Sequence, residues 1–302
     1  KIIYKYSYAL FGLSLLLLIS VEVIGVLGKG ATRWIRVFGF SIQPSELVKI
    51  TIILALAKFY HDIKFENIKK ISYLFFPFLI LAIPFGFVVV QPDLGTSLLI
   101  ASSGIFVIFL AGASWKLILS CIGLASAFAP ILWMFLMKSY QKQRVLTFLN
   151  PEQDPLGSGY HIIQSKIAIG SGGLFGKGWL NGSQGQLDFL PERTTDFIFS
   201  ILAEEFGLVG VVIIICIYLF IVGRGILIAI NSQDLFSRLI AASISLTFFI
   251  YVFVNISMTI GLLPVVGVPL PLISRGGTSM VTLMILLGML MSVGTHKRLV
   301  SK

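Results

Sequence analysis

Apolar blocks of about 20 residues recur along the whole chain, and no other feature constrains its fold as much. Runs such as 10–19 and 209–222 contain no charged residue. A helix needs about 20 apolar residues to cross a hydrocarbon core about 30 Å thick, whereas a transmembrane strand is short and alternates apolar with polar residues. Hydrophobic residues make up 57% of the 302 residues and charged ones only 12%. The sequence therefore predicts an all-α, polytopic transmembrane helix bundle.

Eight segments have the length and hydropathy of membrane spans, and we assign them to a single integral membrane domain, residues 1–302. They lie at 4–27, 45–59, 71–90, 94–111, 115–137, 197–222, 239–262 and 278–293. A long loop, 138–196, separates the fifth span from the sixth. Loops of this length without a fold of their own are usually functional.

Lysine and arginine are distributed unevenly between the two sets of loops. An even number of spans puts both termini on one side, and short cytoplasmic loops are the richer in these residues. With both termini in the cytoplasm, the inner segments hold Lys1, Lys5, Lys58, Lys64, Lys69, Lys70, Lys116, Arg224, Arg238, Lys297, Arg298 and Lys302. The short outer loops hold only Lys29, Arg33, Arg36 and Arg275. The sequence therefore predicts that the long 138–196 loop is extracytoplasmic.

The net charge of +10 does not indicate a nucleic-acid partner, because the basic residues are spread over many loops. They are better explained as topology signals and as contacts with anionic membrane lipids. Cys121 and Cys216 both fall inside spans, so no disulfide framework is predicted. His61, His161 and His296 are scattered without paired ligand spacing, which argues against a metal site built by the protein.

The long loop has a helical part followed by a glycine-rich part. Tyr160, Ile163, Ile167 and Leu174 recur at near-helical spacing, which predicts an amphipathic helix on the outer membrane face. We expect a flexible turn region from the glycines that follow, at 170, 172, 173, 176 and 178. The run GSGGLFGKG is not a P-loop, since its glycine spacing is off by one residue and no Ser or Thr follows the lysine.

Glu46 and Lys49 stand at the start of the second span, in the run PSELVK. Glu46 alone is explained as a first-turn acid that complements the helix dipole, after a proline at the first helical position. Lys49 stands one turn deeper in the span, where a purely structural role explains a charged residue less well. The two side chains share a helix face at i,i+3, so we expect them to pair, facing a cavity.

Asp93 and Asp196 each stand where a polar segment meets an apolar one. Either carboxylate can act simply as a helix cap, but a carboxylate at a membrane boundary also marks a candidate functional site. Glu204 and Glu205 lie inside the apolar run after Asp196, and we expect them to be buried support rather than reacting groups. Such a group of residues fits an enzyme acting on a lipid-linked substrate or a transporter of ions or lipids. The residues alone do not decide between them.

Six blocks of sequence, spread in order along essentially the whole chain, carry a resemblance to a known family. They are KGATRW at 29–34, QPSELVK at 43–49, QPDLGTS at 91–97, DPLGSGYHIIQSKIAIGSGG at 154–173, LPERTTDFIFSILAEE at 190–205 and LPVVGVPLPLIS at 263–274. Together they resemble the blocks of the SEDS family of shape, elongation, division and sporulation proteins, and most of all its rod-shape branch. Family members have ten spans, and this sequence begins just before the third. We expect it to be either a fragment or a naturally shortened protein.

The resemblance implies a peptidoglycan glycosyltransferase that polymerises lipid II at the outer face of the bacterial cytoplasmic membrane, in cell elongation and shape maintenance. It implies partnership with the undecaprenyl-linked substrate, with a class B penicillin-binding protein that crosslinks the strands, and with the elongation machinery. It implies no organic cofactor. A divalent cation, Mg²⁺ or Mn²⁺, is expected with the pyrophosphate of the substrate.

The resemblance also assigns roles to residues. Asp196 occupies the catalytic aspartate of the family's PE-x-x-TDF block, where a carboxylate suits a general base for a sugar hydroxyl. The expected substrate-binding residues are Glu46, Lys49, Arg33, Asp93, Arg193 and Gln184. Of these, Lys49, Arg33 and Arg193 are candidates to neutralise the leaving pyrophosphate. Thr194 stands where many relatives have a histidine, so a bare aspartate base is the simpler interpretation.

Two other functions remain open at the level of the sequence. One is a lipid II flippase, which would use a cavity without forming a bond. The other is a non-catalytic scaffold for a class B penicillin-binding protein. Asp196 discriminates between them and a polymerase, because a transporter or scaffold needs no general base outside the membrane.

Overall fold

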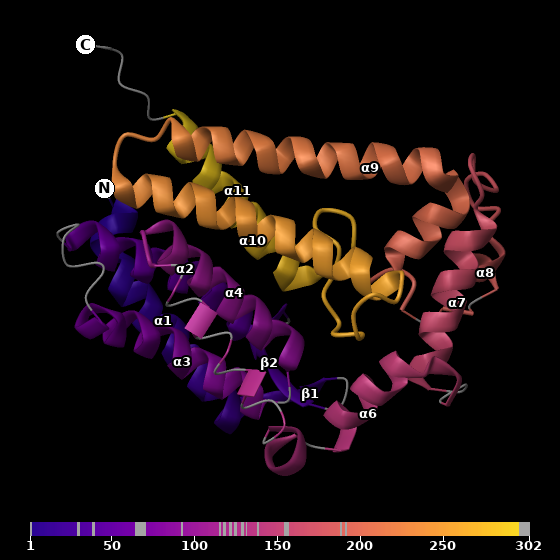
Figure 1. Cartoon of the computed structure of the whole chain (residues 1–302), viewed down its shortest axis with the longest axis horizontal. Helices are drawn as coiled ribbons and strands as arrows, with labels where there is room; N and C mark the ends of the chain where they lie inside the picture. The colour runs from indigo at the N-terminus through magenta and orange to yellow at the C-terminus, as the bar shows by residue number, and fades with distance from the viewer. Residues whose placement is uncertain are drawn as a thin grey trace. The chain divides into compact units, whose positions relative to one another are not determined.

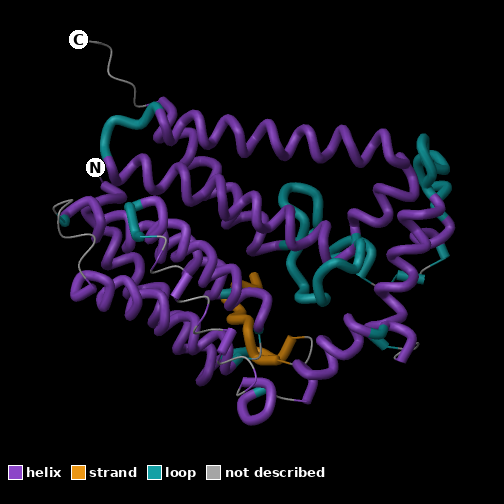
Figure 2. The backbone as a smooth tube through the Cα atoms, viewed as in Figure 1, coloured by secondary structure: helices purple, strands orange, loops and turns teal. Residues whose placement is uncertain are grey.

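The computed structural model describes most of the chain. The described residues are 2–28, 31–37, 40–63, 71–91, 93–114, 116, 119–120, 123, 126–127, 130, 132–137, 139–153, 157–187, 189–190 and 192–295. Helices dominate them, with little strand (Figure 2), so the all-α prediction is confirmed. The chain divides into two compact units: unit 1 is Lys1–Ser114, Ile221–Ile250 and Gly276–Lys302, and unit 2 is Trp115–Phe220 and Tyr251–Arg275.

Unit 1 is a helical bundle with α2 (Pro44–Asp62) at its centre (Figure 1). Among the described residues the main neighbours of α2 are α1 (Ile2–Ile24), α3 (Phe75–Val90), α4 (Leu94–Leu110) and α11 (Gly277–Thr295). From Ile50 to Ala57 no side chain of α2 is more than 9% exposed. This part of α2 is therefore enclosed by its neighbours on every face, including the faces that carry polar residues such as Thr51.

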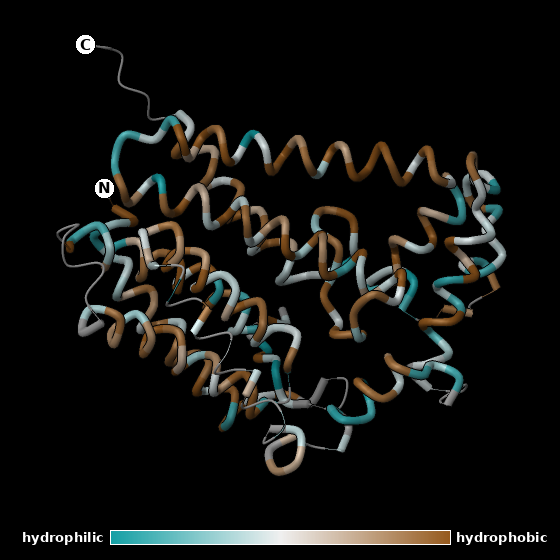
Figure 3. The backbone as a smooth tube through the Cα atoms, viewed as in Figure 1, coloured by the Kyte–Doolittle hydropathy of each residue, from teal (hydrophilic) through white to brown (hydrophobic). Residues whose placement is uncertain are grey.

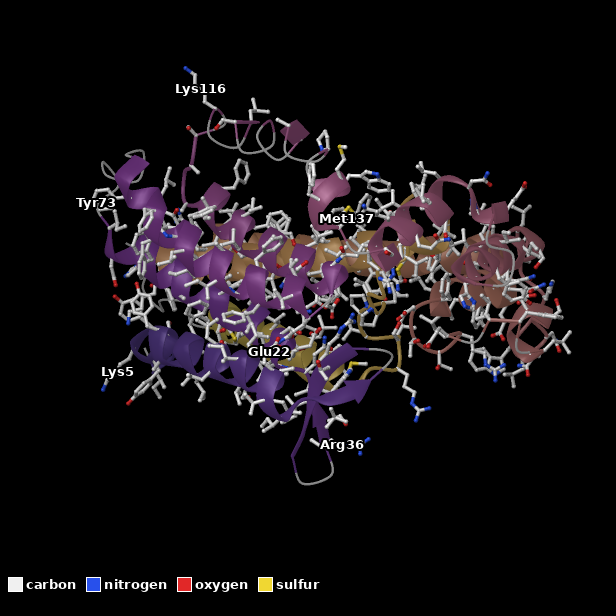
Figure 4. All side chains as sticks on the ribbon, turned by 90° about the horizontal axis from the view of Figure 1, so that it is seen from below. Lys5, Glu22, Arg36, Tyr73, Lys116 and Met137 are labelled. Atoms are coloured by element: carbon white, nitrogen blue, oxygen red, sulfur yellow. The ribbon has the colours of Figure 1, made fainter. Side chains whose placement is uncertain are left out.

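A small sheet, which the sequence reasoning did not predict, follows α1. Strands β1 (Val26–Gly28), β2 (Ala31–Val37) and β3 (Phe40–Ile42) pair antiparallel in that order. Trp34 lies opposite Val26, and Ile35, which is buried, lies opposite Ile42. Figure 4 shows Glu22 at the sheet end of α1 and Lys5 at the other end.

Unit 2 contains the described part of the long loop. Its elements are η3 (Leu132–Leu136), α6 (Ser139–Leu149), η4 (Pro151–Gln153), α7 (Ser158–Ser171), α8 (Ser183–Gln186), the first part of α9 (Ile198–Ile230) and the end of α10 (Leu235–Thr259). A helix is present where one was predicted, as α7, but it ends at Ser171, so Leu174 lies outside it. Ser165 is buried on it and its hydroxyl donates to Thr259 O, 2.7 Å away. Ile167 is exposed, and its contact with a membrane stays a prediction.

Helix α9 is interrupted at Gly207, whose φ of 64° and ψ of −164° are not helical. An interruption frees backbone groups that must find partners. The N–H groups of Lys177 and Gly178 donate to the carbonyls just before it, and the N–H groups just after it donate to the carbonyls of Gly173 and Leu174, over 2.9–3.1 Å. The glycine-rich segment is thus a turn region, as predicted, and its backbone is hydrogen-bonded to α9, while its flexibility stays a prediction.

We expect Gly207→Ala to destabilise the protein. A Cβ at Gly207 would lie 2.3 Å from Gly176 N, at a positive φ that side chains rarely adopt. Strain of this kind costs on the order of 1–3 kcal/mol, and the close contact adds to it. Thermal unfolding in detergent measures the loss. Gly223→Ala is the control, since a Cβ there meets nothing within 4 Å in the same helix, and it is expected to be neutral or slightly stabilising. Equal melting midpoints for the two variants would contradict the close packing at Gly207.

Most of the predicted spans are helices in the structure. Among the described residues, four helices are long and apolar enough to cross a membrane, namely α1, α9, α10 and α11, while α3 and α4 are shorter apolar helices. Hydrophobic residues run along α9 and α10 in Figure 3. The seven predicted spans other than the fifth each fall on a helix of the structure. The fifth, 115–137, lies only partly within the described residues.

Candidate active site

Asp196 is half-buried in the turn that leads into α9. The turn is closed locally, since the N–H groups of Thr195 and Phe197 both donate to Glu192 O at 3.2 Å. The Thr195 hydroxyl also donates to the Glu192 carboxylate at 2.6 Å. Phe197 is 2% exposed and packs with Leu190 and Ala168 in a small core. The buried neighbour on one side and the hydrogen-bonded turn on the other hold Asp196 at the start of the helix.

The loop 263–275 pairs with this turn through backbone carbonyls. Arg275 N donates to Thr194 O at 2.8 Å, and the Ser274 hydroxyl donates to Thr195 O at 2.6 Å. The next carbonyl, that of Asp196, accepts from the Asn255 amide. Three successive carbonyls are therefore tied to residues 255–275, and two sequence blocks far apart in the chain form one surface.

The Asp196 carboxylate faces this loop at Gly267. A Cβ added to Gly267 would lie 3.6 Å from Asp196 Oδ2, and the φ of Gly267 is +75°. Glycine supplies that conformation without strain and leaves bare backbone beside the carboxylate. The side chain expected to react therefore lies against a surface that presents no bulky group at this point.

Arg193 and Gln184, both expected to bind substrate, lie in the same unit as Asp196. The Arg193 guanidinium donates to Gly185 O in the short helix α8. The backbone N–H of Gln184 donates to the Glu204 carboxylate at 3.2 Å. These contacts attach α8 to the Asp196 turn and to α9. A contact of either side chain with substrate stays a prediction.

Glu204 is fully buried and forms an ion pair with Lys177, whose Nζ lies 2.6 Å from Oε1. The same oxygen accepts from the Ser183 hydroxyl at 3.1 Å, so the carboxylate stands at the first residues of α8. A buried carboxylate is tolerated when it is paired and hydrogen-bonded in this way. These contacts fit the expectation of buried support within the bundle for Glu204.

Glu46 and Lys49 form the predicted pair, with Nζ 2.6 Å from Oε1 and side chains 8% and 3% exposed. The Thr282 hydroxyl of α11 donates to the other Glu46 oxygen at 3.2 Å. The pair therefore joins α2 to α11 inside unit 1. That the pair also lines a substrate cavity stays a prediction.

Asp93 has the predicted capping role, because its carboxylate accepts from Thr96 N at 3.2 Å at the start of α4. It also pairs with Arg33, whose Nη1 lies 3.3 Å from Oδ2, and it accepts from the Gln43 amide at 3.3 Å. The guanidinium of Arg33 reaches Gln91 O as well, at 3.1 Å. Asp93 therefore already neutralises part of the positive charge that Arg33 was expected to offer to the pyrophosphate of the substrate.

The structure sorts the expected site residues into two groups. Arg33, Glu46, Lys49 and Asp93 belong to unit 1, and Gln184, Arg193 and Asp196 belong to unit 2. Sequence reasoning missed Asn255, Gly267, Ser274 and Thr282. Asn255 had a usable signal, since it is an amide inside the apolar run 239–262. The other three are small residues whose partners are set only by packing.

The fold and these polar groups define a multi-pass membrane protein that holds a carboxylate at the start of a spanning helix. The chain belongs to the FtsW/RodA/SpoVE family of cell cycle proteins, whose model matches residues 1–299. This confirms the SEDS resemblance.

Individual relatives agree with that membership. The chain is 51% identical over 294 residues to the peptidoglycan glycosyltransferase MrdB of Escherichia coli K12, covering 97% of this chain and 79% of the relative. A chain of a peptidoglycan synthase complex, described as coordinating polymerization and crosslinking, has a TM-score of 0.84 at 34% identity and covers 99% and 83% of the two chains. The rod shape determining protein RodA of Thermus thermophilus has a TM-score of 0.71 at 29% identity and covers 98% and 79%.

Proposed function

We propose that this chain is a peptidoglycan glycosyltransferase that polymerises lipid II into glycan strands during cell elongation and shape maintenance. The observation that carries the proposal is the Asp196 carboxylate, held at the start of a spanning helix in a chain 51% identical to an enzyme of that name. Lipid II is the substrate that suits this site, because its sugar can meet a carboxylate at the boundary while its polyprenyl tail stays in the bilayer.

Asp196 is the general base of the proposed reaction. The 4-hydroxyl of an acceptor GlcNAc attacks the anomeric carbon of a MurNAc, and the bond from that carbon to the polyprenyl pyrophosphate breaks. The hydroxyl proton passes to the Asp196 carboxylate, which must lie within about 3 Å of it. A single displacement with inversion forms no covalent intermediate, so one base suffices.

The leaving pyrophosphate needs positive charge. Arg193, Lys49 and Arg33 are the proposed sources, and the ion pairs of the last two moderate their charge. Among the described residues, no group of three or more His, Cys, Asp or Glu is placed to hold a metal ion, so no step is assigned to one. We also propose that a divalent cation, Mg²⁺ or Mn²⁺, binds together with the pyrophosphate of the substrate.

The proposed setting is the bacterial cytoplasmic membrane, with both termini in the cytoplasm and residues 138–196 outside. The excess of Lys and Arg in the inner loops supports this orientation. A class B penicillin-binding protein is the proposed partner, since the similar chain in the peptidoglycan synthase complex works where polymerization is coordinated with crosslinking.

A polymerisation assay tests the proposal directly. Purified chain is incubated with labelled lipid II and a divalent cation, with and without a class B penicillin-binding protein, and the products are separated by length. Glycan strands longer than the disaccharide substrate are the expected result. If no strands form while the same chain moves lipid II across the bilayer of proteoliposomes, the flippase function is correct instead. If neither occurs but the partner binds, the chain is a scaffold.

A further inference from the structure

Asn255 is the residue that connects the Asp196 turn to the loop opposite it. It lies in α10 and has no exposed surface. Its Nδ2 is 3.0 Å from Asp196 O and 2.7 Å from Val268 O. An amide nitrogen has two N–H bonds, and each is used here on a backbone carbonyl. One side chain thus holds two segments of backbone that are far apart in the chain.

The two carbonyls also determine which way the amide faces. Both are acceptors only, so the nitrogen and not the oxygen must point towards them. Oδ1 is buried and has no hydrogen-bond partner within the part of the chain that the structure describes. A buried acceptor without a partner is unfavourable for stability.

The residues that Asn255 joins are those that surround the proposed base. One bonded carbonyl belongs to Asp196 itself. The other belongs to Val268, next to Gly267, whose backbone faces Asp196 Oδ2. The length of the two hydrogen bonds therefore sets the separation between the base and the loop beside it. Ser274 provides a second connection one residue earlier, through Thr195 O.

We propose that Asn255 is a positioning residue for the transferase reaction, which holds the Asp196 carboxylate at a fixed distance from the 263–275 loop. It touches neither the substrate nor the reacting atoms and acts only through Asp196. The inference rests on the proposed polymerase function, because without a reaction there is nothing to position. A displacement of about 1 Å at a reacting group can cost on the order of 10²-fold in rate.

Asn255→Asp is the variant that tests the proposal, because the two side chains have nearly the same shape. The carboxylate replaces two donors by acceptors, which repel the carbonyls of Asp196 and Val268. We expect kcat to fall by about 10- to 100-fold with KM for lipid II unchanged within about twofold. Ser274→Ala removes the hydroxyl that donates to Thr195 O and accepts from Leu270 N, and it is expected to lower kcat less, because neither bond is made to Asp196 itself. Circular dichroism and thermal unfolding in detergent give the folded fraction, to which kcat is normalised.

Asn231→Asp is the matched control. Asn231 is an exposed amide whose Nδ2 donates to Leu227 O at 2.8 Å near the end of α9, so the same substitution is made at a site outside unit 2. It is expected to have wild-type kcat and KM. If Asn255→Asp does not fold, Asn255→Ser, which keeps one donor, takes its place. The same result is expected for it, a lower kcat with an unchanged KM.

The outcomes separate this proposal from the proposed function. An inactive wild-type chain overturns the polymerase function itself. Active wild type together with an Asn255 variant of unchanged kcat per folded molecule overturns only the positioning role. A loss confined to KM also overturns it, because that result would place Asn255 in substrate binding.

Discussion

Asp196→Asn is expected to abolish glycan polymerisation while the protein still inserts, folds and binds its partner. The amide keeps the shape of the side chain but cannot accept a proton from the acceptor sugar. General-base catalysis typically raises a rate by about 10²- to 10⁴-fold. The rate of the variant should therefore be lower than that of the wild type by at least about 10²-fold. The hydrogen bonds from Asn255 and Ser274 are made to backbone carbonyls of this turn, so they survive the substitution. Product length and yield from labelled lipid II measure the effect.

Asp234→Asn provides the control for that experiment. Asp234 is exposed and caps α10, since its carboxylate accepts from Ser237 N at 2.9 Å. Asparagine is an equally good cap, so this variant should be as stable and as active as wild type. Near-normal glycan synthesis by purified Asp196→Asn would sink the assignment of the base. Loss of activity in both variants would point to a general effect of the substitution.

Lys49→Met is expected to be strongly destabilising. The variant keeps most of the volume of the side chain but leaves the Glu46 carboxylate buried, with Thr282 as a remaining hydrogen-bond partner. Removing one member of a buried ion pair costs about 3–5 kcal/mol, whereas replacing both members is often neutral. We therefore expect the double variant Glu46→Gln/Lys49→Met to recover most of the stability. Thermal unfolding of the wild type, the single variant and the double variant in detergent measures these differences in stability.

Lys58→Met is the control on the same helix. The Lys58 ammonium lies over the rings of Tyr4 and Tyr8 and donates to Lys5 O at 3.2 Å, outside the buried part of α2. Its loss should cost only about 1 kcal/mol. If Lys49→Met were no less stable than Lys58→Met, the buried pair would not hold α2 to α11. Lipid II polymerisation by the double variant then tests the expected cavity role, because a pair that only supports the fold can be replaced without loss of activity.

The class of protein and most of its helices were accessible from the sequence because their signals are local. Residues 209–222 are apolar without interruption, and a segment of that kind has a single stable state in a membrane. Asp93 was predicted as a cap, and Glu46 and Lys49 as a pair, because a cap and an i,i+3 contact depend only on neighbours in the chain. The structure confirms both the cap and the pair.

The glycine-rich segment shows what local reasoning leaves out. Its composition predicts flexibility, because glycine restricts the backbone least. In the structure these glycines allow close approach: a Cβ at Gly176 would lie 2.1 Å from Glu205 O, and one at Gly172 would lie 2.0 Å from Ala203 O. The interruption at Gly207 had no signal either, since the apolar pattern continues across it. Composition does not reveal which backbone a glycine will meet.

The sequence by itself therefore determined that this chain is a membrane helix bundle, that Asp196 stands at the start of a span, and which family blocks surround it. These properties follow from hydropathy, from spacing along single helices and from motif order. Only the tertiary structure decided that Thr194, Thr195 and Asp196 are held through their carbonyls by residues 255–275, with Gly267 beside the carboxylate. The physical reason is that backbone carbonyls are the same in every residue, so the sequence carries no mark of which donor each one will meet.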